Sequence, residues 1–370
     1  MKQYFTNEVK QVLDKVAIVK NLARKKFITS FVLALIQSRK VQFSHLAHYL
    51  NDEAKISCNQ VRIQDFFREV DLDYQALACL LLCFLPQGKI SLCIDRTEWD
   101  FGQCQVNILM VVATSGVLHV PLYWQLLENE SGNSATDDRK AFLSQCIALV
   151  GKERIGMVVA DREFIGHNWL SYLKSHGILF CIRVPKHHLI TRLDGRQHRV
   201  EELLTKASEL SLADCLVDGV WANVYIKKLR SGDILFLLGT VKVGLLGQLY
   251  RKRWTIETLF QNMKGRGFDL ESTHLKLTDK LKKLIGLVSI AYGFCLTYGL
   301  YCHQKIKAIP KKKHGYKANS FFRYGLDCIG YAIRVEWNKD LIAFQTLMRL
   351  LSRTLRQVFQ SSRLPNKIVG

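Results

Sequence analysis

The order of short apolar runs between residues 89 and 184 constrains the fold of this chain more than any other feature. Three strand-like runs come first, ISLCID, QVNILMVVAT and GVLHVPLYWQLL, and Ser115-Gly116 between the last two is a hairpin signal. Helical and strand-like patterns then alternate through RKAFLSQCIALV, RIGMVVAD, HNWLSYLKSHG and ILFCIRV. The predicted order is β-β-β-α-β-α-β, which indicates an α/β protein with a mixed sheet flanked by helices.

This order of elements is that of the ribonuclease H-like fold, which we predict for residues 88–266. Residues 185–243 break the alternation of strand and helix inside that range. They carry strand-like runs and one short helical stretch, EELLTKA. We therefore expect a mainly β insert that stands outside the central sheet.

The regions on either side of this core are predicted to be helical and basic. Residues 1–87 include FSHLAHYL and SCNQVRIQDFFREV, with Ser57 as the expected N-cap of the second helix. The pair is compatible with a DNA-binding helix-turn-helix and with plain helical packing, the commoner case. Residues 267–370 form the expected C-terminal region.

The net charge of +21 is concentrated at the two ends of the chain. Residues 1–40 hold 9 basic and 2 acidic side chains, and residues 305–370 hold 14 and 3. Such a distribution favours polyanion-binding termini around a nearly neutral middle, which would supply non-specific affinity for DNA. A soluble basic protein without such a partner is the alternative.

The segment from Leu284 to Cys302 carries no charge and is close to the length of a membrane span. Its glycines, hydroxyl residues and three tyrosines favour a buried core helix, so no membrane partner is expected. The 11 cysteines form no CxxC pair, which indicates a reducing compartment. The first residues contain no apolar run typical of a signal peptide. These features predict a cytoplasmic protein.

Two strand-like runs end in an aspartate that is followed by arginine, at Asp95 and at Asp161. A carboxylate at the end of a buried strand is costly to desolvate unless a cation or a hydrogen bond compensates it. A divalent metal would relieve the repulsion between two such carboxylates, and separate capping roles are the alternative. Glu98, Asp100 and Glu163 are rival acids nearby, but they lie farther from the apolar runs.

A long amphipathic helix is predicted from Leu245 to Lys264, closed by Gly265 and Gly267. Tyr250, Arg253, Glu257 and Lys264 follow one another at offsets 0, 3, 7 and 14, so they should share one face. A single carboxylate among cations suits a site in which Glu257 holds a metal while the cations bind phosphates.

The spacing Tyr250-x2-Arg253-x3-Glu257-x6-Lys264 resembles the Tyr-Arg-Glu-Lys signature of bacterial insertion-sequence transposases of the IS-four family. These enzymes belong to the DDE transposases, which have a ribonuclease H-like catalytic core. The stretches SLCIDRTEWDFGQCQVNILM and VVADREFIGHNWLSYL are similar to the same family. The resemblance covers roughly residues 88–300.

The resemblance implies that Asp95, Asp161 and Glu257 form a catalytic triad that holds two Mg²⁺ ions, for which Mn²⁺ can substitute. The activity would be metal-dependent cleavage and strand transfer of DNA. Its substrates would be the terminal inverted repeats of the transposon and the target DNA. A homodimer in the synaptic complex and a location on the bacterial nucleoid are also implied. A ribonuclease H-like nuclease or resolvase, or an inactive DNA-binding relative, is the alternative.

The resemblance also assigns four DNA-binding residues. Arg253 and Lys264 would contact phosphates of the transposon end, and Tyr250 a phosphate of the same region. Trp254 would stack on a base or pack in the core, the commoner position of a helical tryptophan. His187 and His188 lack acidic or thiol partners at ligand spacing, so they are expected to be ordinary surface or core residues.

Overall fold

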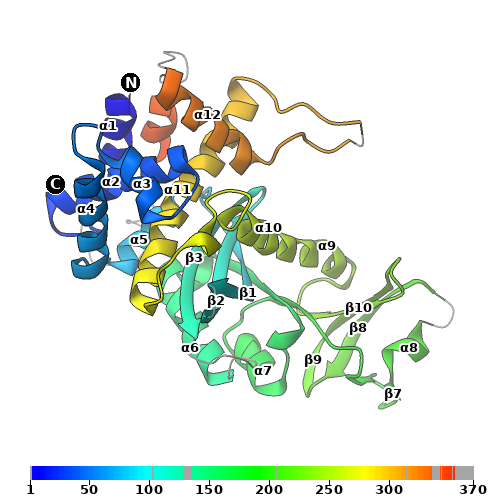
Figure 1. Cartoon of the computed structure of the whole chain (residues 1–370). Coiled ribbons are helices and arrows are strands. Elements are labelled where there is room, and N and C mark those ends of the chain that lie inside the picture. Colours follow the sequence, from blue (N-terminus) through cyan, green and yellow to red (C-terminus); the bar gives the residue numbers. More distant parts are fainter. Residues whose placement is uncertain are drawn as a thin grey trace.

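The computed structural model describes residues 2–101, 104–127, 136–204, 207–313, 315–335, 342, 344–351 and 353–354. It is a mixed α/β structure in which one large mixed sheet is covered by helices (Figure 1). The expected C-terminal region is described only in part, since residues 355–370 lie outside the described residues.

Five helices precede the sheet, as the apolar periodicity predicts. They are α1 (Lys2–Leu13), α2 (Leu22–Ser38), α3 (Phe43–Leu50), α4 (Ile56–Glu69) and α5 (Tyr74–Leu82). The expected N-cap of α4 is wrong by two residues, because Lys55 is the N-cap and Ser57 lies in the first turn. Asn59 of α4 is buried and donates to the backbone oxygens of Ala47 and Asn51, so it ties α4 to the end of α3.

The predicted β-β-β-α-β-α-β order is confirmed. Its elements are β1 (Ile90–Phe101), β2 (Cys104–Ser115), β3 (Leu118–Leu127), α6 (Thr136–Val150), β4 (Ile155–Ala160), α7 (His167–Ser175) and β5 (Phe180–Arg183), with 3₁₀ turns η1 (Lys152–Arg154) and η2 (Arg162–Phe164). Strands β1 to β3 form an antiparallel meander, and β4 and β5 extend it in parallel with β1. The turn at Ser115-Gly116 is the expected hairpin.

Residues 185–243 are mainly β, as expected. They contain β6 (Ile190–Thr191), β7 (Gln197–His198), α8 (Val200–Leu203), β8 (Glu209–Val217), β9 (Val220–Lys228) and β10 (Ile234–Gly239). The expectation that they stand outside the central sheet is wrong. Strand β10 pairs antiparallel with β5, and the sheet continues in the order β3-β2-β1-β4-β5-β10-β9-β8-β6-β7. This pairing satisfies the edge of β5, which would otherwise expose unpaired backbone groups.

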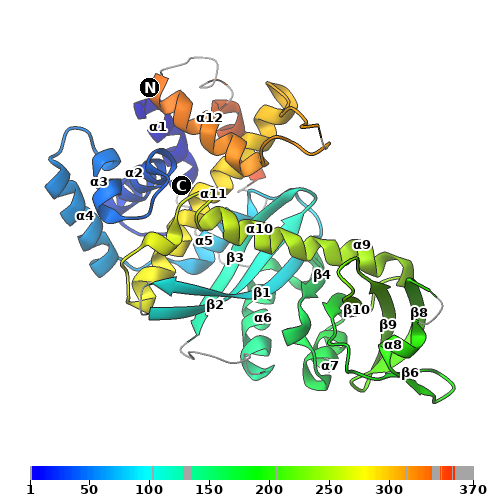
Figure 2. The ribbon, with the colours of Figure 1, turned by 45° about the vertical axis from the view of Figure 1, so that its right-hand side comes forward.

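The segment after β10 lies along the sheet and leads into the longest helix. It contains η3 (Val243–Leu245), α9 (Leu246–Tyr250), η4 (Arg251–Arg253), α10 (Trp254–Met263), η5 (Leu270–Ser272), α11 (Thr278–Lys305) and α12 (Phe321–Val335). Figure 2 shows α9 and α10 lying across the strands, with α11 rising from the sheet toward the N-terminal helices.

Helix α11 contains the uncharged segment Leu284–Cys302. By length and composition it could cross a membrane, but 89% of its most apolar window is buried inside the protein. It packs against α2, α5, α12 and β3. Gly299 of α11 and Gly325 of α12 face each other where a Cβ atom would collide with backbone oxygens, so the two helices cross very closely. These contacts support the prediction of a core helix.

Candidate active site

Strand register places Asp95 beside Asp161. The parallel ladder between β1 and β4 ends with the pair Ile94 and Ala160, so the two aspartates are the next residues on neighbouring strands. Asp161 directly follows β4, as expected. Asp95 does not end its strand, because β1 continues to Phe101 through its pairing with β2. Asp95 is thus the first residue of β1 beyond the parallel ladder, and it still pairs with Met110 of β2.

The predicted single helix from Leu245 to Lys264 is interrupted. A 3₁₀ turn, Arg251–Arg253, separates α9 from α10. The turn is fixed on β1 by two hydrogen bonds: Lys252 Nζ donates to Ser91 Oγ at 2.9 Å, and Cys93 Sγ donates to the Lys252 oxygen at 3.4 Å. These bonds hold the following helix over the point where Asp95 and Asp161 meet.

The guanidinium of Arg253 joins the three predicted acids. Its Nη1 lies 3.1 Å from Asp95 Oδ2 and 3.8 Å from Asp161 Oδ2, and its Nη2 lies 2.5 Å from Glu257 Oε1. The hydroxyl of Tyr250 donates to Asp161 Oδ1 at 3.1 Å. Five side chains, from β1, from the residue after β4 and from α9, η4 and α10, therefore form one cluster, which we call the acid cluster. The first and last acids of the triad are 162 positions apart in the sequence.

Burial dominates the electrostatics of the acid cluster. The Asp95 side chain is only 15% exposed, and burial raises its pKa to about 7 although Arg253 opposes the rise. Burial alone would lower the pKa of Arg253, but Tyr250 and the three carboxylates outweigh it and raise the pKa above its ordinary value. Arg253 is thus held as a permanent cation among carboxyl groups that one cation cannot fully neutralise.

The donor set of the acid cluster fits a hard divalent cation. Its ligands would be three carboxylates, which are the groups that Mg²⁺ prefers. The side chains of Asp161 and Glu257 are 24% and 30% exposed, so an ion can reach them from solvent. Among the described residues, no group of three His, Cys, Asp or Glu is arranged to hold a metal as it stands. The guanidinium of Arg253 lies between the three carboxylates, so an ion and Arg253 would compete for the same oxygens.

The other two predicted DNA-binding residues lie at the margin of the cluster. Trp254 is 66% exposed, so its expected packing in the core is wrong. Lys264 leaves the helix at its C-cap and pairs with Glu271 at 2.8 Å, and its Nζ donates to the Glu98 oxygen. Lys264 does not contact the triad because Gly265 and Gly267 end the helix in a turn that carries its side chain toward β1 and η5.

Two of the rival acids, Glu163 and Glu98, pair with Arg96 instead of Arg253. Glu163 lies 3.5 Å from Arg96, and burial raises its pKa. Glu98 is about half exposed and lies 3.8 Å from the same Arg96. The side chain of Asp100 lies outside the described residues.

Sequence reasoning missed one residue near the cluster, Arg183, the last residue of β5. Its positive charge acts on the hydroxyl of Tyr250 and partly opposes the pKa rise that burial causes there. A signal was available, because ILFCI is a third apolar run that is followed at once by a charged side chain, as ISLCI and MVVA are.

Comparison with known families agrees with this geometry. The family model described as the transposase DDE domain matches residues 87–294, which is more than half of the chain. The match includes all members of the acid cluster and the strands β6 to β10. No curated protein matches the sequence.

The fold and the acid cluster therefore lie within a transposase-type domain. The chain is a member of the DDE transposase-domain family. Membership supports a transposase function, implies a nuclease or transposase activity on DNA, and confirms the DDE transposase prediction at the level of the family. Enzymes of this family generally use divalent metal ions.

Proposed function

We propose that the protein is an insertion-sequence transposase of the IS-four family that cleaves DNA at transposon ends and transfers the freed strands to target DNA. The observation that carries the proposal is the convergence of Asp95, Asp161 and Glu257 on one guanidinium from two strands and a helix. The sheet order β3-β2-β1-β4-β5 supports a ribonuclease H-like core.

Asp95, Asp161 and Glu257 would hold two Mg²⁺ ions, for which Mn²⁺ can substitute. When bound, the ions supply an activated oxygen nucleophile and neutralise the charge on the leaving oxygen. The strands fix Asp95 and Asp161 in register, and the buried face of α10 fixes Glu257. This rigidity limits the movement of the carboxylates during the reaction.

Arg253 and Tyr250 would act on the DNA once their carboxylate partners hold ions. A guanidinium can hold a phosphate through two parallel hydrogen bonds, and the phenol can donate one more. Trp254 lies one helical turn before Glu257 and is exposed, so it is positioned to stack on a base. Lys264 would contact a phosphate farther along β1.

The remaining assignments belong to the same proposal. Residues 1–87 would bind DNA, residues 88–266 would catalyse, and residues 267–370 would form a basic helical region. The working form would be a homodimer that synapses two terminal inverted repeats in the bacterial cytoplasm, on the nucleoid.

The experiment is an in-vitro integration assay on DNA that flanks the reading frame. Purified protein with Mg²⁺ or Mn²⁺ should cleave at an inverted repeat and join it to a plasmid, whereas EDTA should stop both steps. Asp95→Asn and Glu257→Gln should lose about four orders of magnitude in rate, as for members of a catalytic unit, and keep DNA binding.

Glu98→Gln is the matched control, because Glu98 lies on the same strand as Asp95 but outside the acid cluster. Cleavage without joining would favour the nuclease or resolvase alternative. Binding without cleavage in the unmodified protein would favour the inactive relative.

A further inference from the structure

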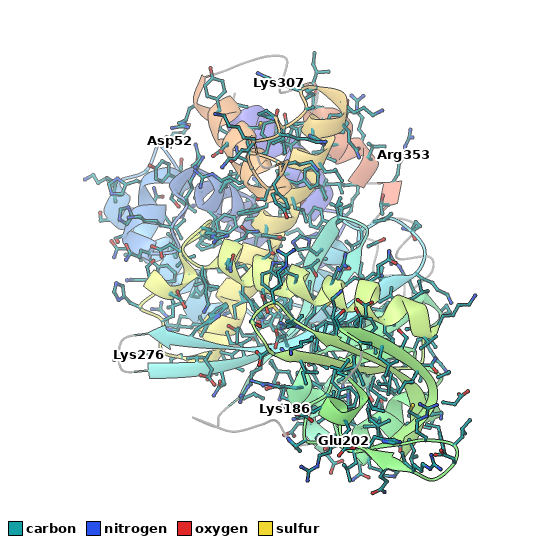
Figure 3. The ribbon with its side chains drawn as sticks, turned by 90° about the vertical axis from the view of Figure 1, so that its right-hand side faces the viewer. Asp52, Lys186, Glu202, Lys276, Lys307 and Arg353 are labelled. Carbon is teal, nitrogen blue, oxygen red and sulfur yellow. The ribbon has the colours of Figure 1, made fainter. Side chains whose placement is uncertain are left out.

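A second charged site lies at the seam between β5 and β10. It is a pocket of about 400 Å³ whose charged lining comprises Arg162, Arg183, Lys186 and Asp233, with His187 beside them. We call it the basic pocket. Lys186 lies on the side of the molecule that Figure 3 turns toward the viewer.

The pocket exists because three strands meet there. Arg162 follows Asp161 after β4, Arg183 ends β5, and β10 begins at Ile234. The loop after β5 stays beside β10, since the amide of Val184 donates to the Phe236 oxygen at 2.8 Å. The rim is therefore formed by backbone that is hydrogen-bonded into the sheet.

The loop that presents Lys186 and His187 is also anchored at its far end. The amide of His188 donates to the Pro185 oxygen, and His188 Nδ1 lies 2.7 Å from Asp218 Oδ1. This hydrogen bond connects the loop to the turn between β8 and β9. The anchored ends limit the movement of the loop backbone before a ligand arrives, which lowers the entropic cost of binding.

The charges of the pocket are not balanced. Within the described part of the chain, Arg162, Arg183 and Lys186 form no ion pair, in contrast to Arg253 and Lys264. One carboxylate, Asp233, faces three permanent cations. An anionic ligand would relieve their mutual repulsion, and two arginines favour one with several oxygens, such as a phosphate.

The pocket adjoins the acid cluster. Arg162 is the residue after Asp161, and Arg183 acts electrostatically on Tyr250, which donates to Asp161. A phosphate in the pocket would therefore lie beside the reacting centre, on the side of β5 and β10.

We propose that the basic pocket binds a backbone phosphate of the DNA strand whose neighbouring phosphodiester lies in the acid cluster. This inference rests on the proposed function. It assigns to the loop after β5, where the β insert begins, a role in orienting the DNA at the cleavage site.

The test is the salt dependence of binding, measured by fluorescence anisotropy with the full chain and a labelled duplex. Lys186→Gln and Arg183→Gln should each weaken binding by about tenfold, as for a charge-assisted hydrogen bond. Each should flatten the slope of log K against log salt by about 0.9, the contribution of one phosphate. The double variant should flatten it little further, because both cations serve the same phosphate.

Arg196→Gln is the matched control. Arg196 is an exposed arginine of the same insert, pairs with Asp194, and lies outside the pocket. It should keep the wild-type slope. Lys186 is exposed, so its variant decides the question even if Arg183→Gln does not fold.

Melting temperatures measured with inorganic phosphate distinguish a site for DNA from a site for the free phosphate ion. If phosphate raises the melting temperature of wild type but not of Lys186→Gln while DNA binding is equal in both, the DNA assignment is overturned. Equal slopes in wild type and both variants overturn it as well. If wild type binds no duplex, the proposed function fails together with the pocket, whereas normal wild-type binding with unaffected variants refutes the pocket alone.

Discussion

The two halves of the ten-stranded sheet differ in how they use their side chains. In the inner half, β3-β2-β1-β4-β5, strands such as β4 are buried almost throughout. In the outer half, β10-β9-β8-β6-β7, strand β8 is mostly exposed or half-buried, and β9 mixes buried with exposed residues. The inner half is covered on both faces and can hold a few charged groups in exact register, whereas the outer half presents a surface. The difference predicts that equivalent changes have unequal effects in the two halves.

The test with the largest expected effect removes one cation beside each half of the sheet. Arg253→Ala leaves three largely buried carboxylates without their cation, so we expect a loss of about 3 kcal/mol in the unfolding free energy of the metal-free protein. Mg²⁺ should restore much of the loss, because it can take the place of the guanidinium. Thermal and urea unfolding with and without Mg²⁺ measure both effects.

Lys227→Ala provides the counterpart in the outer half. Lys227 pairs with Glu209 at 2.6 Å, but both side chains are exposed, so its removal should leave stability nearly unchanged. Similar losses for Arg253→Ala and Lys227→Ala would contradict the difference between the halves.

The seam between the halves should be sensitive to volume. A Cβ atom on Gly239 of β10 would lie 2.5 Å from the Phe180 oxygen, which belongs to the backbone of β5 and cannot move freely. Gly239→Ala should therefore cost about 1–3 kcal/mol in unfolding free energy, as for overpacking. Gly244→Ala, where a Cβ meets open space, is the control and should cost little. A neutral Gly239→Ala would mean that β10 is not firmly paired with β5.

The basic segments outside the sheet should contribute to non-specific affinity. Deletion of residues 305–370 is not a clean test, because Phe322, Leu326 and Ile329 of α12 are buried in the core. Changing the exposed Lys311, Lys312 and Lys313 to Gln is cleaner. The slope of log K against log salt on duplex DNA should fall by up to about 0.9 for each phosphate that the variant no longer neutralises. An unchanged slope would exclude this segment from the DNA surface.

The last test concerns the pH dependence that His119 on β3 gives to the inner half. Its Nε2 accepts from the Tyr292 hydroxyl, and burial lowers its pKa to about 4. Between about pH 6.5 and pH 4 the unfolded chain binds a proton that the native protein does not, so stability falls as the pH falls.

His119→Gln should remove that part of the pH dependence. Asp95 contributes the opposite slope in part of the same range, because its raised pKa makes the metal-free protein lose stability as the pH rises from about 4 to about 7. The difference between wild type and His119→Gln isolates the histidine, since the contribution of Asp95 cancels. If the unfolding free energies of the two proteins changed with pH in parallel, the predicted contribution of His119 would be refuted.

The sequence predicts the inner half well because its signals are local. Apolar runs of strand length, the hairpin at Ser115-Gly116 and the acids after the apolar runs specify the elements and bring Asp95, Asp161 and Glu257 together. The pairing of β10 with β5 depends on which sheet edge is free, and composition carries no information about that. The 3₁₀ turn at Arg251–Arg253 depends on contacts with Ser91 and Cys93, which no helical periodicity encodes.

Side-chain partners were the least predictable feature. Periodicity places Arg253 and Lys264 on one helix face, but the turn after Met263 and the ion pair with Glu271 separate them. Trp254 is exposed, against the usual tendency of a helical tryptophan, because Ile256, Leu259 and Met263 already fill the buried face of α10.

The bridging position of Arg253 has a thermodynamic consequence. A cation that binds the three carboxylates must first displace the guanidinium, and a phosphate that attracts the guanidinium frees the carboxylates. The two binding equilibria are therefore linked, and by reciprocity each ligand raises the affinity for the other. If the acid cluster binds a divalent ion and a nucleic-acid strand, as proposed above, the ion would be held weakly until the strand is present. Formation of the reactive site would then depend on the arrival of the substrate.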